Sequence, residues 1–153
     1  MRAAYMDNVD KAADKFEFIL VVSEASSGVE KFGRQRRTWN GGKWASDECC
    51  GSSDDVGFIS KMIDELKIGF KVDEKQIYAT GISNGGLMTN RLGCELSDKI
   101  AAIATVAHAA IASECKLLRV MPVMDIHGTA DPANPPDGSE PKSIFAKEKR
   151  YGV

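Results

Sequence analysis

The sequence predicts an α/β fold, with a mostly parallel sheet that carries helices on both faces. Short apolar runs at 18–22 and 100–106 are rich in β-branched residues, which is typical of strands buried on both sides. Between such runs lie segments with helical spacing, of which 54–70 is the clearest. Strands that alternate with helices imply βαβ units and right-handed crossovers. The chain has 153 residues, which predicts a single domain spanning 1–153.

The first third of the chain is predicted to hold a helix, a strand and a long loop. Residues 2–15 have apolar side chains at helical spacing, and the run at 18–22 is expected to be a buried strand. Residues 23–53 are polar and rich in glycine, so we expect a loop that carries Trp39 and Trp44. A loop of this length is unusual unless it binds something or is held by a disulfide.

The rest of the chain alternates between helix and strand. The helix over 54–70 begins at Asp54 and Asp55, whose carboxylates favour a helix N-terminus. Pro122 is unfavourable within a central strand, so the paired part of the last strand is expected at 123–126. The other predicted elements are a strand at 76–80, a helix ending near 96, a strand at 100–106, a loop at 127–141 and a helix from about 142.

The charge balance gives no reason to expect a polyanionic partner. The chain has 20 basic and 22 acidic residues, a net charge of −2, so neither nucleic acid nor an anionic membrane is predicted to bind. The basic run at Arg34, Arg36 and Arg37 is interpreted as a solvated loop face. No apolar run approaches the ~20 residues of a membrane span, and residues 1–7 lack the apolar core of a signal peptide.

The four cysteines, Cys49, Cys50, Cys94 and Cys115, leave two alternatives open. They form no C-x-x-C pair and the chain has only two histidines, so we predict no metal site and no cofactor. An even number of cysteines permits two disulfides with three possible pairings. Four free, buried thiols are the alternative.

The segment 81–85, Gly-Ile-Ser-Asn-Gly, is the strongest functional signal. A predicted strand enters this G-x-S-x-G motif and a predicted helix leaves it, which is the context of a nucleophile elbow. Such a turn strains the backbone of its serine, here Ser83, and its glycines avoid collisions with the strand and helix. The alternative is an ordinary tight turn in which the serine makes only local hydrogen bonds.

A catalytic Ser83 would need a base, an orienting acid and donors for an oxyanion. Asp131, in the loop after the last strand, is expected to be the acid; the alternative is an aspartate that shapes the Asp-Pro turn. The backbone N–H of Asn84 is expected to be one oxyanion donor. No histidine follows Asp131. His127 is interpreted as structural, and His108 is expected to line the site.

Five segments share one order and spacing with a known family: 39–42 (WNGG), 49–58 (CCGSSDDVGF), 77–88 (IYATGISNGGLM), 91–98 (RLGCELSD) and 126–131 (IHGTAD). Together they resemble the polyhydroxybutyrate depolymerase and feruloyl esterase family of α/β-hydrolases. The resemblance extends over most of the chain between 18 and 137, which makes it more specific than the elbow motif alone.

The resemblance implies an α/β-hydrolase-like sheet and a serine esterase that cleaves carboxylic esters on polysaccharides or polyesters. It implies that Ser83 is the nucleophile, that Asp131 is the acid partner, and that Asn84 donates to the oxyanion. The loop with Trp39 would lie beside the substrate. The resemblance further implies a secreted protein in which some of the cysteines form disulfides.

The chain departs from the family in ways that weaken the expected activity. Family domains are longer at both ends, and an early strand with its oxyanion loop and the segment with the base histidine have no counterpart here. We therefore expect an internal part of a hydrolase domain with little turnover of simple esters. The alternatives are a non-catalytic protein that binds a glycan or polyester against Trp39 and Trp44, and a truncated product without a function of its own.

Overall fold

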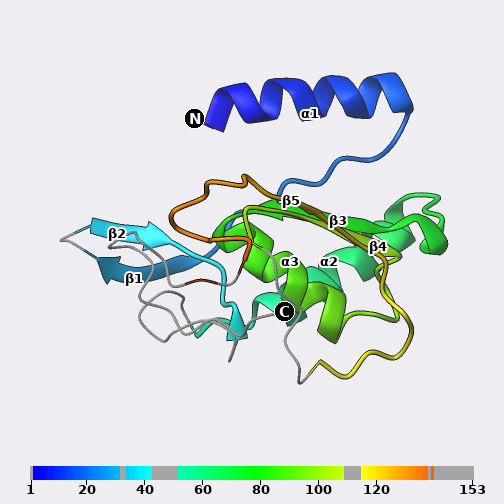
Figure 1. The fold of residues 1–153 in the computed structure, drawn as a ribbon. Coiled ribbons are helices and arrows are strands. Elements are labelled where there is room, and N and C mark those ends of the chain that lie inside the picture. The colour runs from blue at the N-terminus through cyan, green and yellow to red at the C-terminus, as the bar shows by residue number, and fades with distance from the viewer. Residues whose placement is uncertain (1, 32–33, 43–51, 109–114, 138, 140–153) are drawn as a thin grey trace.

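A parallel sheet lies at the centre of the fold, as predicted (Figure 1). The structure is a computed structural model, and it describes residues 2–31, 34–42, 52–108, 115–137 and 139. The sheet has three strands in the order β3-β4-β5, and both pairs are parallel. The strands are β3 (Tyr78–Ile82), β4 (Ala102–Val106) and β5 (Val123–Ile126). This arrangement confirms the α/β class.

Two helices, α2 (Asp55–Gly69) and α3 (Asn84–Glu95), lie against one face of the sheet (Figure 1). The helix α2 begins where the sequence predicts, since the side chain of Asp54 accepts a hydrogen bond from the backbone N–H of Gly57 at 2.9 Å. The apolar faces of both helices, the inward side of β4 and apolar residues of the connecting segments form the core. Its buried members are Val56, Ile59, Ile63, Met88, Leu92, Leu96, Ile100, Ile103 and Met121.

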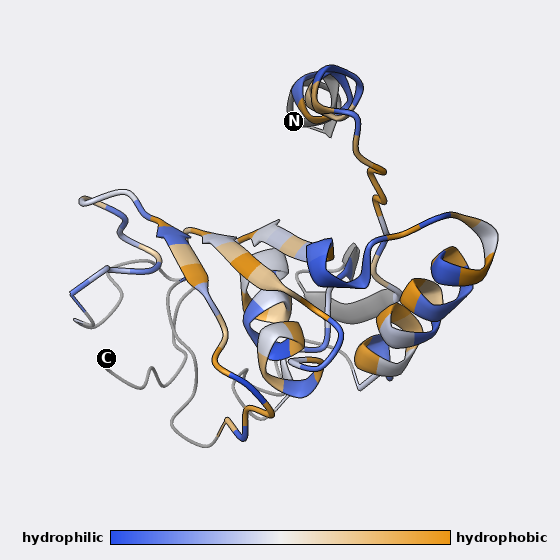
Figure 2. Cartoon of the chain, turned by 90° about the vertical axis from the view of Figure 1, so that its right-hand side faces the viewer, coloured by the Kyte–Doolittle hydropathy of each residue, from blue (hydrophilic) through white to orange (hydrophobic). Residues whose placement is uncertain are grey.

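The opposite face of the sheet is uncovered in the part of the chain that the structure describes. Tyr78 is 65% exposed and Met124 is 61% exposed, and both belong to strands of this sheet. Helix α1 (Arg2–Phe16) lies on this side but stands clear of the strands (Figures 1 and 2). The expectation of helices packed on both faces is therefore wrong for the described residues. No helix among the described residues is long and apolar enough to cross a membrane.

The predicted strand at 18–22 is also wrong. The segment has no regular secondary structure, and its side chains face solvent, with Ile19 52% and Val22 58% exposed. A strand needs a neighbour to take its backbone hydrogen bonds, and among the described residues none pairs with this segment. Apolar composition alone could not reveal this absence of a partner.

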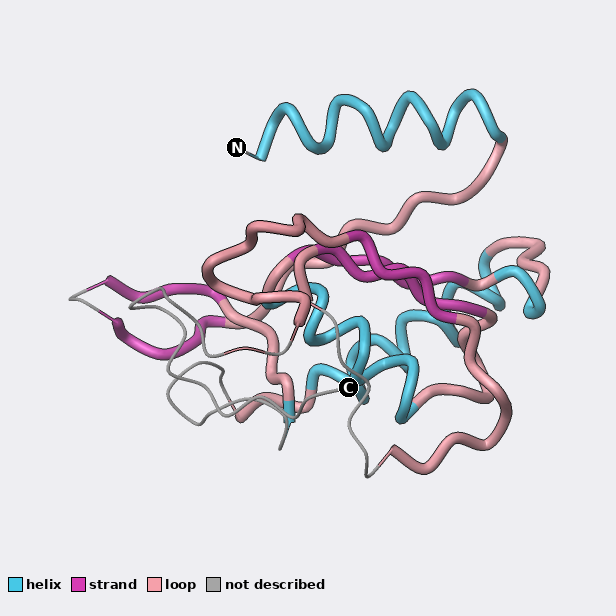
Figure 3. Tube along the Cα trace, viewed as in Figure 1, coloured by secondary structure: helices cyan, strands magenta, loops and turns pink. Residues whose placement is uncertain are grey.

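A hairpin interrupts the predicted loop at 23–53. It consists of β1 (Ser27–Lys31) and β2 (Arg34–Arg37), which pair antiparallel apart from the three-stranded sheet (Figure 3). The strands are polar and short, so they lack the alternation of apolar residues that marks a strand in sequence. Trp44, Cys49, Cys50 and the helix predicted from 142 lie outside the described residues.

The strand that leads into the serine motif starts later than predicted. Residues Glu74–Gln76 form a 3-10 turn capped by Asp73, so β3 begins at Tyr78 and continues through Gly81 to Ile82. At β5, the prediction that regular pairing starts after Pro122 is confirmed. Its carbonyl accepts a hydrogen bond from the N–H of Ile103 at 3.1 Å, and regular pairing begins at residue 123.

Candidate active site

Ser83 occupies a sharp corner between β3 and α3. Its backbone angles, φ 54° and ψ −120°, lie in a region that L-residues rarely adopt. The backbone is held there from both sides, because its N–H donates to the carbonyl of Val106 at 2.9 Å and its carbonyl accepts from Leu87 at 3.0 Å. The side chain is exposed and makes no capping hydrogen bond to the helix. The geometry predicted for the elbow is thus present.

The glycines around Ser83 do not all serve the same purpose. A side-chain carbon on Gly81 would overlap the backbone carbonyl of Gly85, so only glycine fits at position 81. A side-chain carbon on Gly86 would lie 2.9 Å from Cβ of His108, which is also too close. At Gly85, however, nothing lies within 4 Å of the added carbon. The expectation that both motif glycines avoid collisions therefore holds for Gly81 and is wrong for Gly85.

The side chain of Asn84 joins the elbow to the backbone of Trp39. Its Oδ1 accepts a hydrogen bond from the Trp39 N–H at 2.7 Å, and its Nδ2 donates to the Trp39 carbonyl at 3.1 Å. This reciprocal pair fixes residue 84, the residue whose own N–H is expected to face the oxyanion. The indole of Trp39 is half-buried and packs against the hydrophobic core. This packing gives Trp39 a structural role, while its predicted contact with substrate stays a prediction.

Residue Asn40 extends this attachment to both helices. Its N–H donates to a carboxylate oxygen of Asp55 at 2.6 Å, and its carbonyl accepts from Arg91 at 2.8 Å. Arg91 is held in turn by Glu95, with 2.6 Å between Nε and Oε1. These roles were not predicted from the sequence. The burial of Asp55 at the start of a helix gives no signal in sequence, because Asp54 beside it already accounts for the cap.

Asp131 lies in the loop that follows β5. Its Oδ1 accepts hydrogen bonds from the backbone N–H groups of Ala133 and Asn134, at 2.8 Å and 2.9 Å. This is the turn-shaping role that the sequence left open as an alternative. Its Oδ2 lies 3.5 Å from Nε2 of His127. An aspartate can shape its turn with one oxygen and orient a base with the other, so the acid role remains a prediction.

The elbow and the Asp131 loop both attach to the end of β4. The N–H of Ser83 bonds to Val106, as described above, and the side-chain amide of Asn134 donates to the carbonyl of Ala107 at 2.7 Å. Ala107 itself donates to the carbonyl of Ile126 at 3.0 Å. The carboxyl ends of all three parallel strands therefore meet at one edge, which is where ligands bind in open α/β sheets.

The two histidines lie at the same edge in different surroundings. The His127 side chain is only 7% exposed; its Nε2 lies 2.6 Å from the carbonyl of Asn134, and its Nδ1 lies 3.3 Å from Oδ2 of Asp125. Both ring nitrogens are thus engaged, in agreement with a structural interpretation. His108 follows β4, and its carbonyl accepts a hydrogen bond from the buried side chain of Asn90 at 3.2 Å. Its contact with Gly86 places it beside the elbow.

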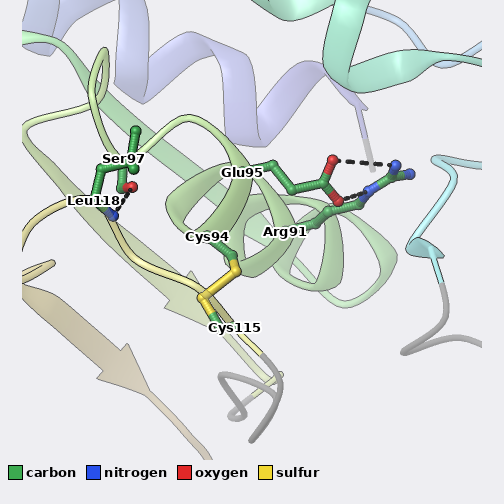
Figure 4. The surroundings of a disulfide bond; sticks show 6 residues. All are labelled: Arg91, Cys94, Glu95, Ser97, Cys115 and Leu118. Atoms are coloured by element: carbon green, nitrogen blue, oxygen red, sulfur yellow. Dashed lines mark hydrogen bonds and ion pairs between the residues drawn. A yellow bond between two sulfur atoms is a disulfide. The ribbon is translucent and has the colours of Figure 1, made fainter.

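A disulfide joins Cys94 on α3 to Cys115, with 5.6 Å between the Cα atoms (Figure 4). Nearby, the hydroxyl of Ser97 accepts a hydrogen bond from the N–H of Leu118 at 3.0 Å. Both contacts attach the segment between β4 and β5 to the end of α3. Of the two alternatives for the cysteines, the disulfide holds for this pair. Among the residues that the structure describes, no three His, Cys, Asp or Glu side chains gather to hold a metal ion.

Comparison with known proteins gives partial matches, and no family model matches the chain. The chain is 40% identical over 96 residues to feruloyl esterase B of Piromyces equi, a match that covers 60% of this chain and 18% of that protein. It is 32% identical over 77 residues to the bifunctional acetylxylan esterase/xylanase XynS20E of Neocallimastix patriciarum, covering 50% of this chain and 12% of that protein. It is 36% identical over 75 residues to the oxidized polyvinyl alcohol hydrolase of a Sphingopyxis species, covering 44% and 20%.

These matches confirm the predicted resemblance to the feruloyl esterase type of protein. They extend over about half of this chain and over a fifth or less of the three relatives. Two of the three relatives are named esterases, so the resemblance is to carboxylic ester hydrolases. None of these three relatives is named a polyhydroxybutyrate depolymerase, so that part of the expectation stays a prediction.

Proposed function

We propose that this chain carries the nucleophile region of a serine carboxylic ester hydrolase of the feruloyl esterase type, with Ser83 as the nucleophile. The observation that carries the proposal is the strained, exposed corner at Ser83, whose hydroxyl does not cap the helix behind it. A strained backbone at a sheet edge is characteristic of functional positions. The resemblance to named esterases supports the same assignment.

The proposed reaction is acyl transfer through Ser83. Its hydroxyl oxygen attacks the ester carbonyl and passes its proton to a base, which gives a tetrahedral oxyanion. The N–H of Asn84, at the first turn of α3, is one donor to that oxyanion. Expulsion of the protonated alcohol leaves an acyl ester on Ser83, and water then releases the carboxylic acid. Asp131 is proposed to orient the base.

The base is the catalytic group for which this site offers the least support. The sequence holds two histidines, and both ring nitrogens of His127 already have partners. His108 lies beside the elbow through its contact with Gly86, and we propose that it lines the site. We therefore expect slow turnover by the present chain, since a serine hydroxyl without a base is a poor nucleophile.

The proposed substrates are carboxylic esters attached to polysaccharides, with feruloyl or acetyl groups as the acyl part. This choice follows the relatives that are named feruloyl esterase and acetylxylan esterase. Polyester substrates and a secreted location belong to the same proposal through the family resemblance. The alternative of a glycan-binding protein has less support, because the indole of Trp39 is half-buried against the core.

Hydrolysis of p-nitrophenyl acetate in the presence of imidazole tests the proposal. Imidazole in solution can act as the base, so we expect the rate above that of the Ser83→Ala variant to rise by about tenfold or more. Both proteins are measured at the same imidazole concentration, because imidazole alone also cleaves this ester. Ser52→Ala, at another exposed serine, is the matched control and should behave like the unaltered chain.

Equal rates for the unaltered chain and Ser83→Ala at every imidazole concentration would contradict the proposal. A high rate without imidazole that Ser83→Ala abolishes would support the nucleophile but overturn the account of the base. In that case His108 would be the first residue to substitute.

A further inference from the structure

The imidazole of His127 lies in a buried position between the end of β5 and the loop that carries Asp131. Its side chain is 7% exposed, less than the carboxylates beside it, which are 16% exposed for Asp131 and 33% for Asp125. Its Nε2 lies 2.6 Å from the carbonyl oxygen of Asn134. A carbonyl oxygen can only accept a hydrogen bond, so this contact requires a proton on Nε2.

The bond from His127 reaches Asp131 through Asn134. The N–H of Asn134 donates to Oδ1 of Asp131 at 2.9 Å, while the carbonyl of the same residue takes the proton of His127. The side chain of Asn134 also donates to the carbonyl of Ala107 at 2.7 Å. Residue 134 is thus held at three points, and one of them is the ring of His127.

The second ring nitrogen of His127, Nδ1, faces the sheet. This nitrogen lies 3.3 Å from Oδ2 of Asp125 on β5. The other oxygen of Asp125 accepts a hydrogen bond from the hydroxyl of Thr105 at 3.0 Å, and Thr105 on β4 is only 1% exposed. Close polar contacts therefore connect a buried position on β4, through Asp125 and the ring of His127, with the loop that holds Asp131.

We propose that His127 is a positioning residue: its Nε2–H closes the loop 127–134 and thereby fixes the carboxylate of Asp131 at the sheet edge. This role of His127 rests on the proposed function in one respect, because that proposal makes Asp131 the acid partner. The physical reason is that a loop of this length keeps many conformations unless its ends are tied, and the bond from His127 to residue 134 ties them.

Two amide variants separate the function of Nε2 from that of Nδ1. In His127→Gln the amide nitrogen can reach the position of Nε2, whereas in His127→Asn it reaches only the position of Nδ1. The measured quantity is hydrogen exchange at the backbone amides of Ala133 and Asn134, which donate to Asp131. We expect exchange to accelerate by about tenfold or more in His127→Asn and to stay near the original rate in His127→Gln.

The amide of Ile103, bonded to Pro122 within the sheet, serves as an internal control and should not change. Equal exchange in the two variants, or unchanged exchange in His127→Asn, would overturn the proposal. Should both variants fail to fold, nitrogen NMR of the ring in the unaltered chain decides the matter. We expect the proton on Nε2, and a ring with an unprotonated Nε2 would overturn the proposal.

None of these measurements uses ester turnover. If the exchange and NMR results contradict the proposal while imidazole-dependent hydrolysis through Ser83 is observed, the role of His127 is removed and Ser83 stays the nucleophile. The opposite result, with the loop held by His127 and no Ser83-dependent hydrolysis, would remove the proposed function alone.

Discussion

At the scale of single residues, steric fit decides what the elbow tolerates. Position 81 faces the backbone of Gly85, whereas position 85 faces open space. A protein backbone cannot move aside as the end of a flexible side chain can, so an added carbon at 81 must displace the turn itself. Displacement of that turn would also move Ser83, the residue on which the proposed chemistry depends.

This asymmetry predicts opposite effects for two alanine substitutions that look alike in sequence. Gly81→Ala should lower the free energy of unfolding by about 1–3 kcal/mol, because the new methyl group overlaps backbone atoms. Gly85→Ala lies within α3 at a position with room, so it should be neutral or stabilise the chain by up to about 1 kcal/mol. Urea unfolding of both variants checks this, and equal losses of stability would count against the geometry of the elbow.

The sequence predicted the positions of Ser83 and Asp131 at strand ends, because the G-x-S-x-G motif and the loop after the last strand are local features. The sequence could not predict the tertiary contacts that surround these two residues. Asn84 binds the backbone of Trp39 across 45 positions of sequence, and His127 was recognisable as structural only from its place at a strand end. Such contacts depend on the tertiary arrangement, which a local pattern does not contain.

At the scale of elements, α3 connects the site to the rest of the fold. Its first turn carries Asn84, its middle packs on β3 and β4 through residues such as Met88, and its end bears Cys94. The disulfide from Cys94 to Cys115 ties the segment before β5 to this helix across a separation of 21 residues. The loop that follows β5 carries Asp131, so this bond constrains the chain on the path between the two site residues.

Removal of the disulfide should therefore cost stability. For a loop of this size, the double variant Cys94→Ala/Cys115→Ala should lower the free energy of unfolding by about 3 kcal/mol. The single variant Cys115→Ala, which breaks the same bond and leaves the other cysteines in place, is the matched control and should lose a similar amount. Unfolding curves that coincide for the oxidised chain and the double variant would show that the bond contributes nothing.

The elements themselves were predictable to different degrees. The helices α2 and α3 and the strand β5 follow from apolar spacing, the Asp54 cap and Pro122, all of which act locally. The run at 18–22 has the composition of a strand, but strand formation depends on a paired neighbour. The hairpin β1–β2 shows the reverse, since it pairs without any apolar alternation.

At the scale of the whole molecule, the two faces of the sheet differ. One face is covered by α2 and α3 (Figure 1), and the other exposes apolar side chains of β3 and β5, among them Tyr78 and Met124. The site lies on neither face. It lies at the carboxyl edge, where hydrogen bonds from Ser83 and Asn134 converge on the end of β4. The geometry of this edge therefore depends on the parallel pairing of β3, β4 and β5 and on the packing of α3 against β3 and β4.

The most direct test of the central claim is covalent labelling of Ser83 with a fluorophosphonate, with the modified residue located by mass spectrometry of peptides. If the corner between β3 and α3 presents a reactive hydroxyl, Ser83 should be labelled at least about tenfold faster than the exposed Ser52, and imidazole should accelerate only the former. Labelling at the same rate on both serines, or none on Ser83 with imidazole present, would contradict the account.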